Sequence, residues 1–344
     1  MTRSAALTAR SGQAPAVPDR PAAPTGAARR RLQLLLAWLW LLDGMLKLQP
    51  YMFTKNFAPM TLGDAEDGAP FWLADPINWA KRIVGDHPVG TMIVFALVEI
   101  AIGLAIAYRP TLKYGLIACL CWVPFLWFFA EGLGGLTTSA AGPLTGAPGA
   151  SILYGLLAVL LWPTSRSDST DEASRFIGPR AAKAVWVVLW GLLAALALLP
   201  ANRAPGAVSD IISDNAMGTP TGYTSLLNHA ASWADGRGAE ISITLAVLSA
   251  AVAVSVLLPS RRAVRAGIVL AIVIATLIWI FAEGFGMPFM GMATDPDTAP
   301  LLAAIAVAFW PVTRAFSATS PDADTSAATA SDPEISPSPE GSAA

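Results

Sequence analysis

The sequence has little charge and few of the side chains that bind metals or carry out redox chemistry. Charged residues make up 13% of the 344, and there are two cysteines and two histidines. The net charge of −2 and the lack of a basic stripe with interleaved aromatic residues argue against a nucleic-acid partner. No phosphate loop, zinc-protease motif or nucleophile elbow is present. The sequence therefore does not indicate a P-loop nucleotide hydrolase, a zinc protease or a serine hydrolase with a nucleophile elbow.

The scarce cysteines and histidines are poorly placed for metal or haem binding. Cys119 and Cys121 lie two residues apart in an apolar run, and on a helix such residues point about 200° away from each other. His87 and His229 both fall between apolar runs, which argues against a haem held by two histidines within a bilayer. We interpret the cysteines as small core residues and predict no metal site.

Hydrophobic residues are abundant, at 54% of the chain, and gather in long runs. Two shorter runs, Ala150 to Trp162 and Thr298 to Val312, are weaker candidates for membrane spans than the other six. Those six are long enough, or nearly so, to cross a hydrocarbon core of about 30 Å, and they cover residues 32–49, 89–108, 114–130, 184–199, 241–258 and 266–282. We predict an all-α polytopic membrane protein of about eight transmembrane helices, in contact with the lipid bilayer.

The positions of Lys and Arg predict the orientation, because basic residues are held on the cytoplasmic side. With the N-terminus inside, most of them fall in cytoplasmic segments: Arg29, Arg30, Arg31, Arg109, Lys113, Arg166, Arg175, Arg180, Lys183, Arg261, Arg262, Arg265 and Arg314. This orientation requires both weak spans. It places both termini in the cytoplasm of a bacterial-type inner (plasma) membrane.

The two ends of the chain differ in composition from the rest. Residues 1–28 and 317–344 are rich in Ala, Pro and Ser, which is typical of disordered segments. The first apolar run begins after about 30 residues and lacks a small-residue cleavage site, so we interpret it as a retained helix and not a signal peptide. We predict disordered cytoplasmic tails.

A duplicated motif organises the chain. Trp-Phe-Phe-Ala-Glu-Gly at 127–132 recurs as Trp-Ile-Phe-Ala-Glu-Gly at 279–284, and Pro50 and Pro200 end the first span of each half. We predict two related four-helix units, 29–165 and 184–316, joined by a cytoplasmic linker at 166–183. An even number of spans gives both units one orientation, so an axis along the membrane normal should relate them.

Each unit also has a long loop after its first span. In the first unit, Asp75 and Pro76 predict the start of a short interfacial helix, with Phe71, Trp72 and Trp79 as anchors. The matching stretch of the second unit covers residues 225–233 and contains a histidine.

Four ionisable residues lie within or beside the apolar runs of the first unit, where charges are costly and indicate function. Asp43 and Lys47 are four residues apart on one helix face, a natural spacing for an ion pair. Glu99 should lie about 15 Å deep from the outer side, and Glu131 lies at the outer end of its helix. We expect them to converge, with Glu99 and Glu131 as acid/base groups and Lys47 balancing their charge. The alternative is a neutralising network that only fixes helix packing.

The second unit lacks most of these groups. Leu193, Ala197 and Ala251 stand where we expect the counterparts of Asp43, Lys47 and Glu99, and Glu283 remains as the counterpart of Glu131. We therefore assign the working site to the first unit and Glu283 to a supporting, cofactor-binding role.

Two strings around these residues resemble a known family. Gly-Met-Leu-Lys-Leu at 44–48 and Val-Glu-Ile-Ala-Ile-Gly-Leu at 98–104, followed by Arg109, resemble the DoxX family of small four-helix membrane proteins. That family is related to the DoxD subunit of thiosulfate:quinone oxidoreductase and to the redox-associated MauE proteins. The resemblance covers the first helix pair. It implies a redox-associated role that handles thiols, sulfur compounds or quinone, with a redox protein or quinone as partner.

Other functions stay open. The same polar cluster would suit a transporter of a small solute or cation. A non-catalytic assembly or copper-handling role is a further alternative, because Met287, Met290 and Met292 offer soft ligands to Cu(I), although packing is the preferred interpretation. The uncharged segment 132–165 is either a re-entrant element or an extended outer loop.

Overall fold

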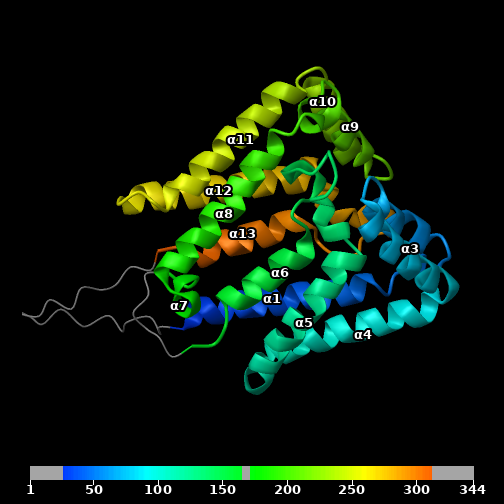
Figure 1. Ribbon diagram of the computed structural model, residues 1–344, viewed down its shortest axis with the longest axis horizontal. Coiled ribbons are helices and arrows are strands. Elements are labelled where there is room, and N and C mark those ends of the chain that lie inside the picture. The colour runs from blue at the N-terminus through cyan, green and yellow to red at the C-terminus, as the bar shows by residue number, and fades with distance from the viewer. Residues whose placement is uncertain (1–25, 165–170, 312–344) are drawn as a thin grey trace, which may run out of the picture. The chain divides into compact units, whose positions relative to one another are not determined.

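The computed structural model describes residues 26–164 and 171–311, which form an all-α protein as predicted (Figure 1). Five of its helices are long and apolar enough to cross a membrane. They are α4 (Pro88–Ala107), α5 (Leu112–Phe129), α8 (Pro179–Ala197), α11 (Gly238–Ser255) and α12 (Arg261–Phe281). The chain is therefore a multi-pass membrane protein. Nearly all of the predicted tails, 1–28 and 317–344, lies outside the described residues.

The remaining predicted spans form helices that are more polar or shorter. The first run forms α1 (Ala27–Leu46), which has 20 residues but carries three arginines and Asp43. The two weak candidates form α6 (Ala150–Leu160) and α13 (Thr298–Ala308), with 11 residues each. At 1.5 Å per residue, such a helix is about 16 Å long, roughly half of a hydrocarbon core.

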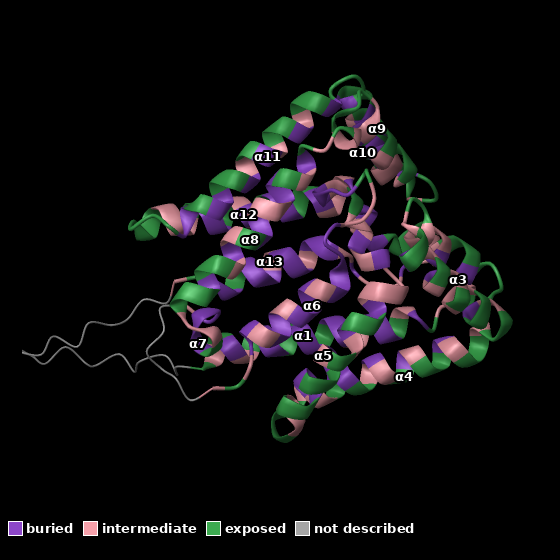
Figure 2. Ribbon diagram, in the orientation of Figure 1, coloured by how far each residue is buried: buried purple, intermediate pink, exposed green. Residues whose placement is uncertain are grey.

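The short helices lie in the middle of the protein, among the longer ones. Helices α6 and α13 pack against each other, α5 packs on α6, and α12 packs on α13. Most of their residues are buried, including Leu157 on α6 and Leu301 on α13 (Figure 2). Cys119 and Cys121 on α5 are free thiols, one buried and one exposed, as their spacing on a helix predicts.

Helix α1 packs along α4, and α8 packs along α11. Trp40 on α1 and Trp190 on α8 are both completely buried. Two glycines bring α1 and α4 close together. A Cβ atom on Gly44 would lie 2.9 Å from the Ala96 carbonyl oxygen, and one on Gly103 would lie 2.9 Å from that of Ala37. Small residues at such contacts permit close backbone approach between membrane helices.

One end of the spans is covered by helices α2 (Gly63–Glu66), α3 (Phe71–Asp86), α9 (Ala207–Asp214) and α10 (Thr221–Ala234) (Figure 1). We call it the cap end. The predicted start of the first interfacial helix is wrong, because α3 begins at Phe71 and Pro76 lies inside it. Leu73 is completely buried beside Ile77 in an apolar cluster, so packing extends the helix ahead of the proline.

The expected interfacial anchors lie on the outside of α3. Phe71, Trp72 and Trp79 are all exposed, which leaves their rings free to contact a membrane interface. The matching stretch, residues 225–233, lies within α10. Its histidine, His229, is exposed, and its ring Nδ1 hydrogen-bonds Ser225 one turn earlier in the same helix.

The opposite end of the spans carries a buried ion-pair network. Arg29 Nε lies 3.3 Å and Arg175 Nε lies 3.0 Å from Glu172 Oε2, and the Arg29 guanidinium donates to the Leu160 carbonyl at 3.4 Å. The start of α1, the end of α6 and the short α7 (Ser174–Ile177) therefore meet here. The predicted linker 166–183 packs onto the protein from residue 171, and α8 begins within it, at Pro179.

Candidate functional site

The centre of the candidate site is a buried ion pair between the two helices that the glycines bring together. Lys47 Nζ on α1 lies 2.9 Å from Glu99 Oε2 on α4, and the Glu99 side chain is completely buried. The indole Nε1 of Trp122 on α5 donates to Glu99 Oε1 at 3.5 Å. The structure thus corrects the expected pairing, because Lys47 pairs with Glu99 across the helices and not with Asp43 four residues earlier.

Asp43 lies beside this pair and lines a cavity of about 90 Å³ together with Lys47, Glu131 and Tyr154. Asp43 and Tyr154 are both nearly inaccessible to solvent. Asp43 and Tyr154 interact with each other, although Asp43 Oδ1 and the Tyr154 hydroxyl form no hydrogen bond of normal geometry within the described residues. A buried carboxyl group with so few good hydrogen bonds favours its protonated form.

Sequence reasoning missed two residues of the site, Thr294 and Asp295, which line the same cavity. The Thr294 carbonyl accepts a hydrogen bond from Lys47 Nζ at 3.2 Å. Next to it, the Ala293 carbonyl accepts one from Gln49 Nε2 at 2.9 Å. The only signal in the sequence is a pair of acids, Asp295 and Asp297, in a loop with no other charge. The loop before α13 therefore completes a site whose other groups lie on or directly after α1, α4, α5 and α6.

Glu131 lies across the cavity, just after α5, and holds the start of α6. Its Oε1 accepts hydrogen bonds from the Ser151 backbone N–H at 2.8 Å and from the Ser151 hydroxyl at 2.6 Å. Its Oε2 is buried without a hydrogen bond among the described residues. Burial, and then the charge of Asp295, raise the pKa of Glu131 to about 7, while the hydrogen bonds from Ser151 oppose the shift.

Glu283 holds the start of α13 in the same way. It accepts hydrogen bonds from the Thr298 hydroxyl and, at 3.1 Å, from the Ala299 backbone N–H, so both of its oxygens are used. Burial raises the pKa of Glu283 to about 7, and these hydrogen bonds oppose the shift. The residue does not line the cavity beside Lys47.

The duplicated motif thus forms one local structure twice. The Trp127 indole donates to the Pro148 carbonyl at 2.8 Å, and the Trp279 indole donates to the Pro296 carbonyl at 3.0 Å. Two residues after each glutamate, Leu133 and Phe285 have positive φ angles of 59° and 60°. In each copy, tryptophan and glutamate fasten a tight loop to the beginning of a short helix.

The structure brings Asp43, Lys47, Glu99 and Glu131 together, as the sequence predicts for the first unit, and leaves Glu283 apart from them. Among the described residues, no group of three or more His, Cys, Asp or Glu side chains is arranged to hold a metal ion. In comparisons with protein-family models, curated proteins and solved structures, nothing matches this chain.

Proposed function

We propose that the chain is a redox-associated membrane component in which Asp43, Lys47, Glu99 and Glu131 form a proton-handling site near the outer face. The observation that carries the proposal is the excess of acid around the small cavity. The carboxyl groups of Asp43, Glu131 and Asp295 line it, and the one ammonium group beside them, that of Lys47, already pairs with Glu99. Asp43 Oδ1 and Glu131 Oε2 have neither an ion pair nor a hydrogen bond of normal geometry among the described residues. Buried like charges repel strongly, so such a cluster favours binding a proton.

The size of the cavity supports proton handling over enclosure of a large substrate. Its volume of about 90 Å³ is well below the roughly 300 Å³ of the smaller ligand pockets. At about 30 Å³ per water molecule, it suits a short water chain. Reduction of a quinone or disulfide takes up protons together with electrons. The cluster would supply or accept those protons, and a partner or a substrate in the membrane would carry the electrons.

The resemblance of residues 44–48 and 98–104 to the DoxX family supports the redox assignment. These two strings contain Lys47 and Glu99, which form the buried ion pair. The protein's own thiols lie elsewhere, since Cys119 and Cys121 do not line the cavity. Thiol chemistry at this site would therefore act on a thiol from outside the chain.

We further propose that the protein has eight spans in two related units, with α6 and α13 completing their crossings through the compact loops before them. Patterns of burial support this arrangement. Buried positions on α1 and α4 recur 150 residues later on α8 and α11. In this register Glu99 matches the buried Ser249 and not Ala251, which is exposed. At this position the second unit thus has a serine hydroxyl where the first unit has a carboxyl group.

Co-purification tests the redox proposal. The gently solubilised protein should carry a quinone, or a redox partner with its own absorbance, identified by mass spectrometry and absorption spectroscopy. Glu99→Gln should abolish proton-coupled turnover with that partner while folded protein remains in the membrane. A purified protein with neither quinone nor redox partner would count against the proposal.

The orientation is tested by cysteine labelling in a chain without its two native cysteines. Ser139 lies in the loop between α5 and α6, and Ser260 directly precedes α12; both positions are exposed. We expect a membrane-impermeant maleimide to label the Ser139→Cys variant in intact cells and the Ser260→Cys variant only after lysis. The reverse pattern would overturn the proposed topology.

Transport of a small solute or cation is the second candidate, favoured by the Asp43 and Glu131 oxygens that have no hydrogen-bond partner among the described residues. It predicts solute flux in vesicles that contain this protein alone, and the flux should stop in Asp43→Asn. Copper handling by Met287, Met290 and Met292 stays a prediction, which Cu(I) titration of a triple Met→Leu variant would test.

A further inference from the structure

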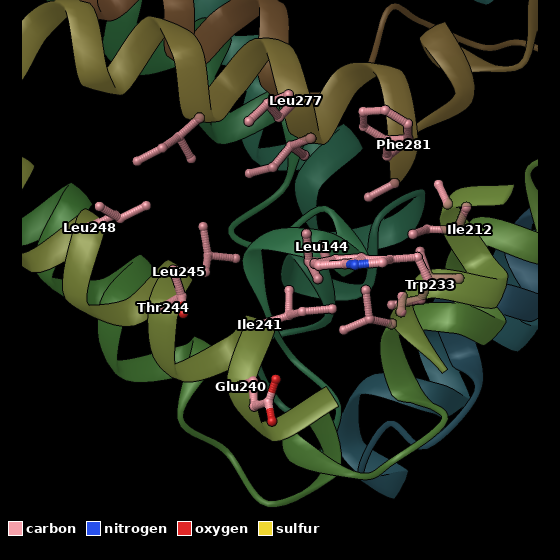
Figure 3. A pocket seen from close by; sticks show the side chains of 17 residues that line it. Leu144, Ile212, Trp233, Glu240, Ile241, Thr244, Leu245, Leu248, Leu277 and Phe281 are labelled. Carbon is pink, nitrogen blue, oxygen red and sulfur yellow. The ribbon is translucent and has the colours of Figure 1, made fainter. Parts of the chain in front are cut away.

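A second cavity, larger and almost wholly apolar, lies between α11 and α12. Its volume is about 460 Å³, within the range of about 300–1,000 Å³ for small-molecule pockets. Ile241, Leu245 and Leu248 form its wall on α11, and Ile274, Leu277 and Phe281 form the wall on α12. Figure 3 shows the Leu277 and Phe281 side chains facing those of α11, with Trp233 closing the cap end. We call this space the α11–α12 groove.

The equivalent space in the α1–α6 region is filled by aromatic side chains. Phe95 on α4 lies with its ring centroid 5.3 Å from that of Trp122 and 5.8 Å from that of Phe125 on α5. The Phe125 ring in turn lies 5.1 Å from Phe129. In the register of the duplicated motif, Ile274 and Leu277 replace Trp122 and Phe125. The groove is therefore the volume that smaller residues have vacated. Because Leu277 and Trp233 in its lining are exposed, it opens onto the surface of the protein, where a large apolar patch marks a binding site.

The cap end of the groove carries one basic and one acidic side chain. The Arg237 guanidinium stacks over the Trp233 ring, 4.9 Å from its centroid, and donates to the Trp233 carbonyl at 3.0 Å. Glu240, in the first turn of α11, lines the edge of the groove (Figure 3). Both charged side chains are exposed and form no ion pair with each other in the described part of the chain. Glu240 thus lies at the edge of the groove, and Arg237 lies behind it, stacked on the Trp233 ring that lines the groove.

We propose that the α11–α12 groove binds one acyl chain of an amine-bearing phospholipid, with the phosphate at Arg237 and the primary ammonium at Glu240. Apolar burial along the walls holds the chain, the arginine suits a phosphate, and the carboxylate accepts hydrogen bonds from an N–H donor. Trp233 lies where aromatic rings favour the membrane interface. An anionic glycerol headgroup can offer Glu240 hydroxyl donors but no positive charge, and a choline headgroup has a positive charge but no N–H. Only a headgroup with a primary ammonium offers Glu240 both. This site is independent of the proton-handling proposal.

Filling the groove tests the chain-binding part. Ile274→Trp with Leu277→Phe restores the residues that occupy the α1–α6 region. The purified variant should retain about tenfold less phospholipid per chain in mass spectrometry than the wild type, a change equivalent to roughly 1.4 kcal/mol. Val269→Phe, at an exposed position of α12 that does not line the groove, is the matched control and should retain lipid normally. Equal retention in the filled variant and the wild type, with both folded by circular dichroism, would overturn the proposal.

Exchange of lipid headgroups tests the assignment of the phosphate to Arg237 and of the ammonium to Glu240. In nanodiscs of mixed lipid, the wild type should enrich phosphatidylethanolamine over phosphatidylcholine and phosphatidylglycerol. Glu240→Gln should remove the preference for ethanolamine over choline, and Arg237→Gln should weaken retention of every phospholipid. Enrichment of phosphatidylglycerol, or equal retention of all three lipids, would overturn the assignment of the two charges.

Discussion

The α1–α6 and α8–α13 regions place helices in the same order but fill the space between them differently. In the first, the Lys47–Glu99 pair is buried, and half-buried and exposed aromatic rings pack against one another between α4 and α5. In the second, Leu193 and Ala197 are buried at the positions matching Asp43 and Lys47, and an open apolar groove replaces the rings. On the proposal that the two regions are related units, one helix arrangement tolerates either filling, and the charged residues of the first region are expected not to be required for the fold itself.

The ion pair gives the largest expected effect. Lys47→Met leaves Glu99 buried without its partner and should destabilise the protein by about 3–5 kcal/mol, because an uncompensated charge in a dry interior is costly. The double variant Lys47→Met/Glu99→Leu should recover most of this loss, since it copies the apolar interior of the second region. Thermal unfolding in detergent, followed by tryptophan fluorescence, measures both.

A double variant less stable than Lys47→Met would break the comparison, because the first region would then depend on its charges for folding. Leu193→Met, a volume-conserving change at a buried position of the second region, is the control and should cost less than about 1.5 kcal/mol.

The two capping glutamates give the next largest effect and sharpen the comparison. Each oxygen of Glu283 now accepts a hydrogen bond, one from the Thr298 hydroxyl and one from the Ala299 N–H. Glu283→Gln puts an NH₂ group in front of one of these donors and should therefore lower the free energy of unfolding by about 1–3 kcal/mol. Glu131→Gln should be close to neutral, since one of its oxygens has no partner in the described structure and the NH₂ can take that place. Chemical denaturation of the two variants side by side measures the difference, and equal costs would contradict the hydrogen-bond assignment.

A smaller effect concerns pH. The pKa values of Glu131 and Glu283 are raised to about 7 in the folded protein, above the ordinary value of 4.5. The folded state therefore binds more protons than the unfolded state between these values, so this contribution to stability is greatest at acid pH and is lost as pH rises towards 7. The unfolding temperature should rise when pH is lowered from about 8 to 6. The rise should shrink in Glu131→Gln/Glu283→Gln, and an unchanged pH dependence would show that other groups cause it.

The helices were predictable because long apolar runs carry the signal, and the convergence of Asp43, Lys47 and Glu99 followed from their depth along those runs. The sequence did not predict which acid pairs with Lys47. Spacing along one helix favours Asp43, but Gly44 and Gly103 bring α4 close enough for Glu99 to form the ion pair instead. This contact depends on helix pairing, which the hydropathy pattern does not contain.

Two other features were hidden for similar reasons. Thr294 lies 247 residues from Lys47, and no local pattern links a loop to a helix at that distance. The start of α3 at Phe71 overrides the local signal of Pro76, because Leu73 is buried in the core. In each case a tertiary contact outweighed a short-range preference.

Infrared spectroscopy of protonated carboxylic acids reports whether the carboxyl groups beside Lys47 bind a proton. The measurement uses the Glu283→Gln background, which removes the capping carboxyl outside the cavity, and follows the carbonyl-stretch band as pH is stepped through neutrality. A titrating band should remain, and it should disappear when Asp43→Asn, Glu99→Gln and Glu131→Gln are added. A background protein with no such band would contradict a proton-handling site between α1 and α4.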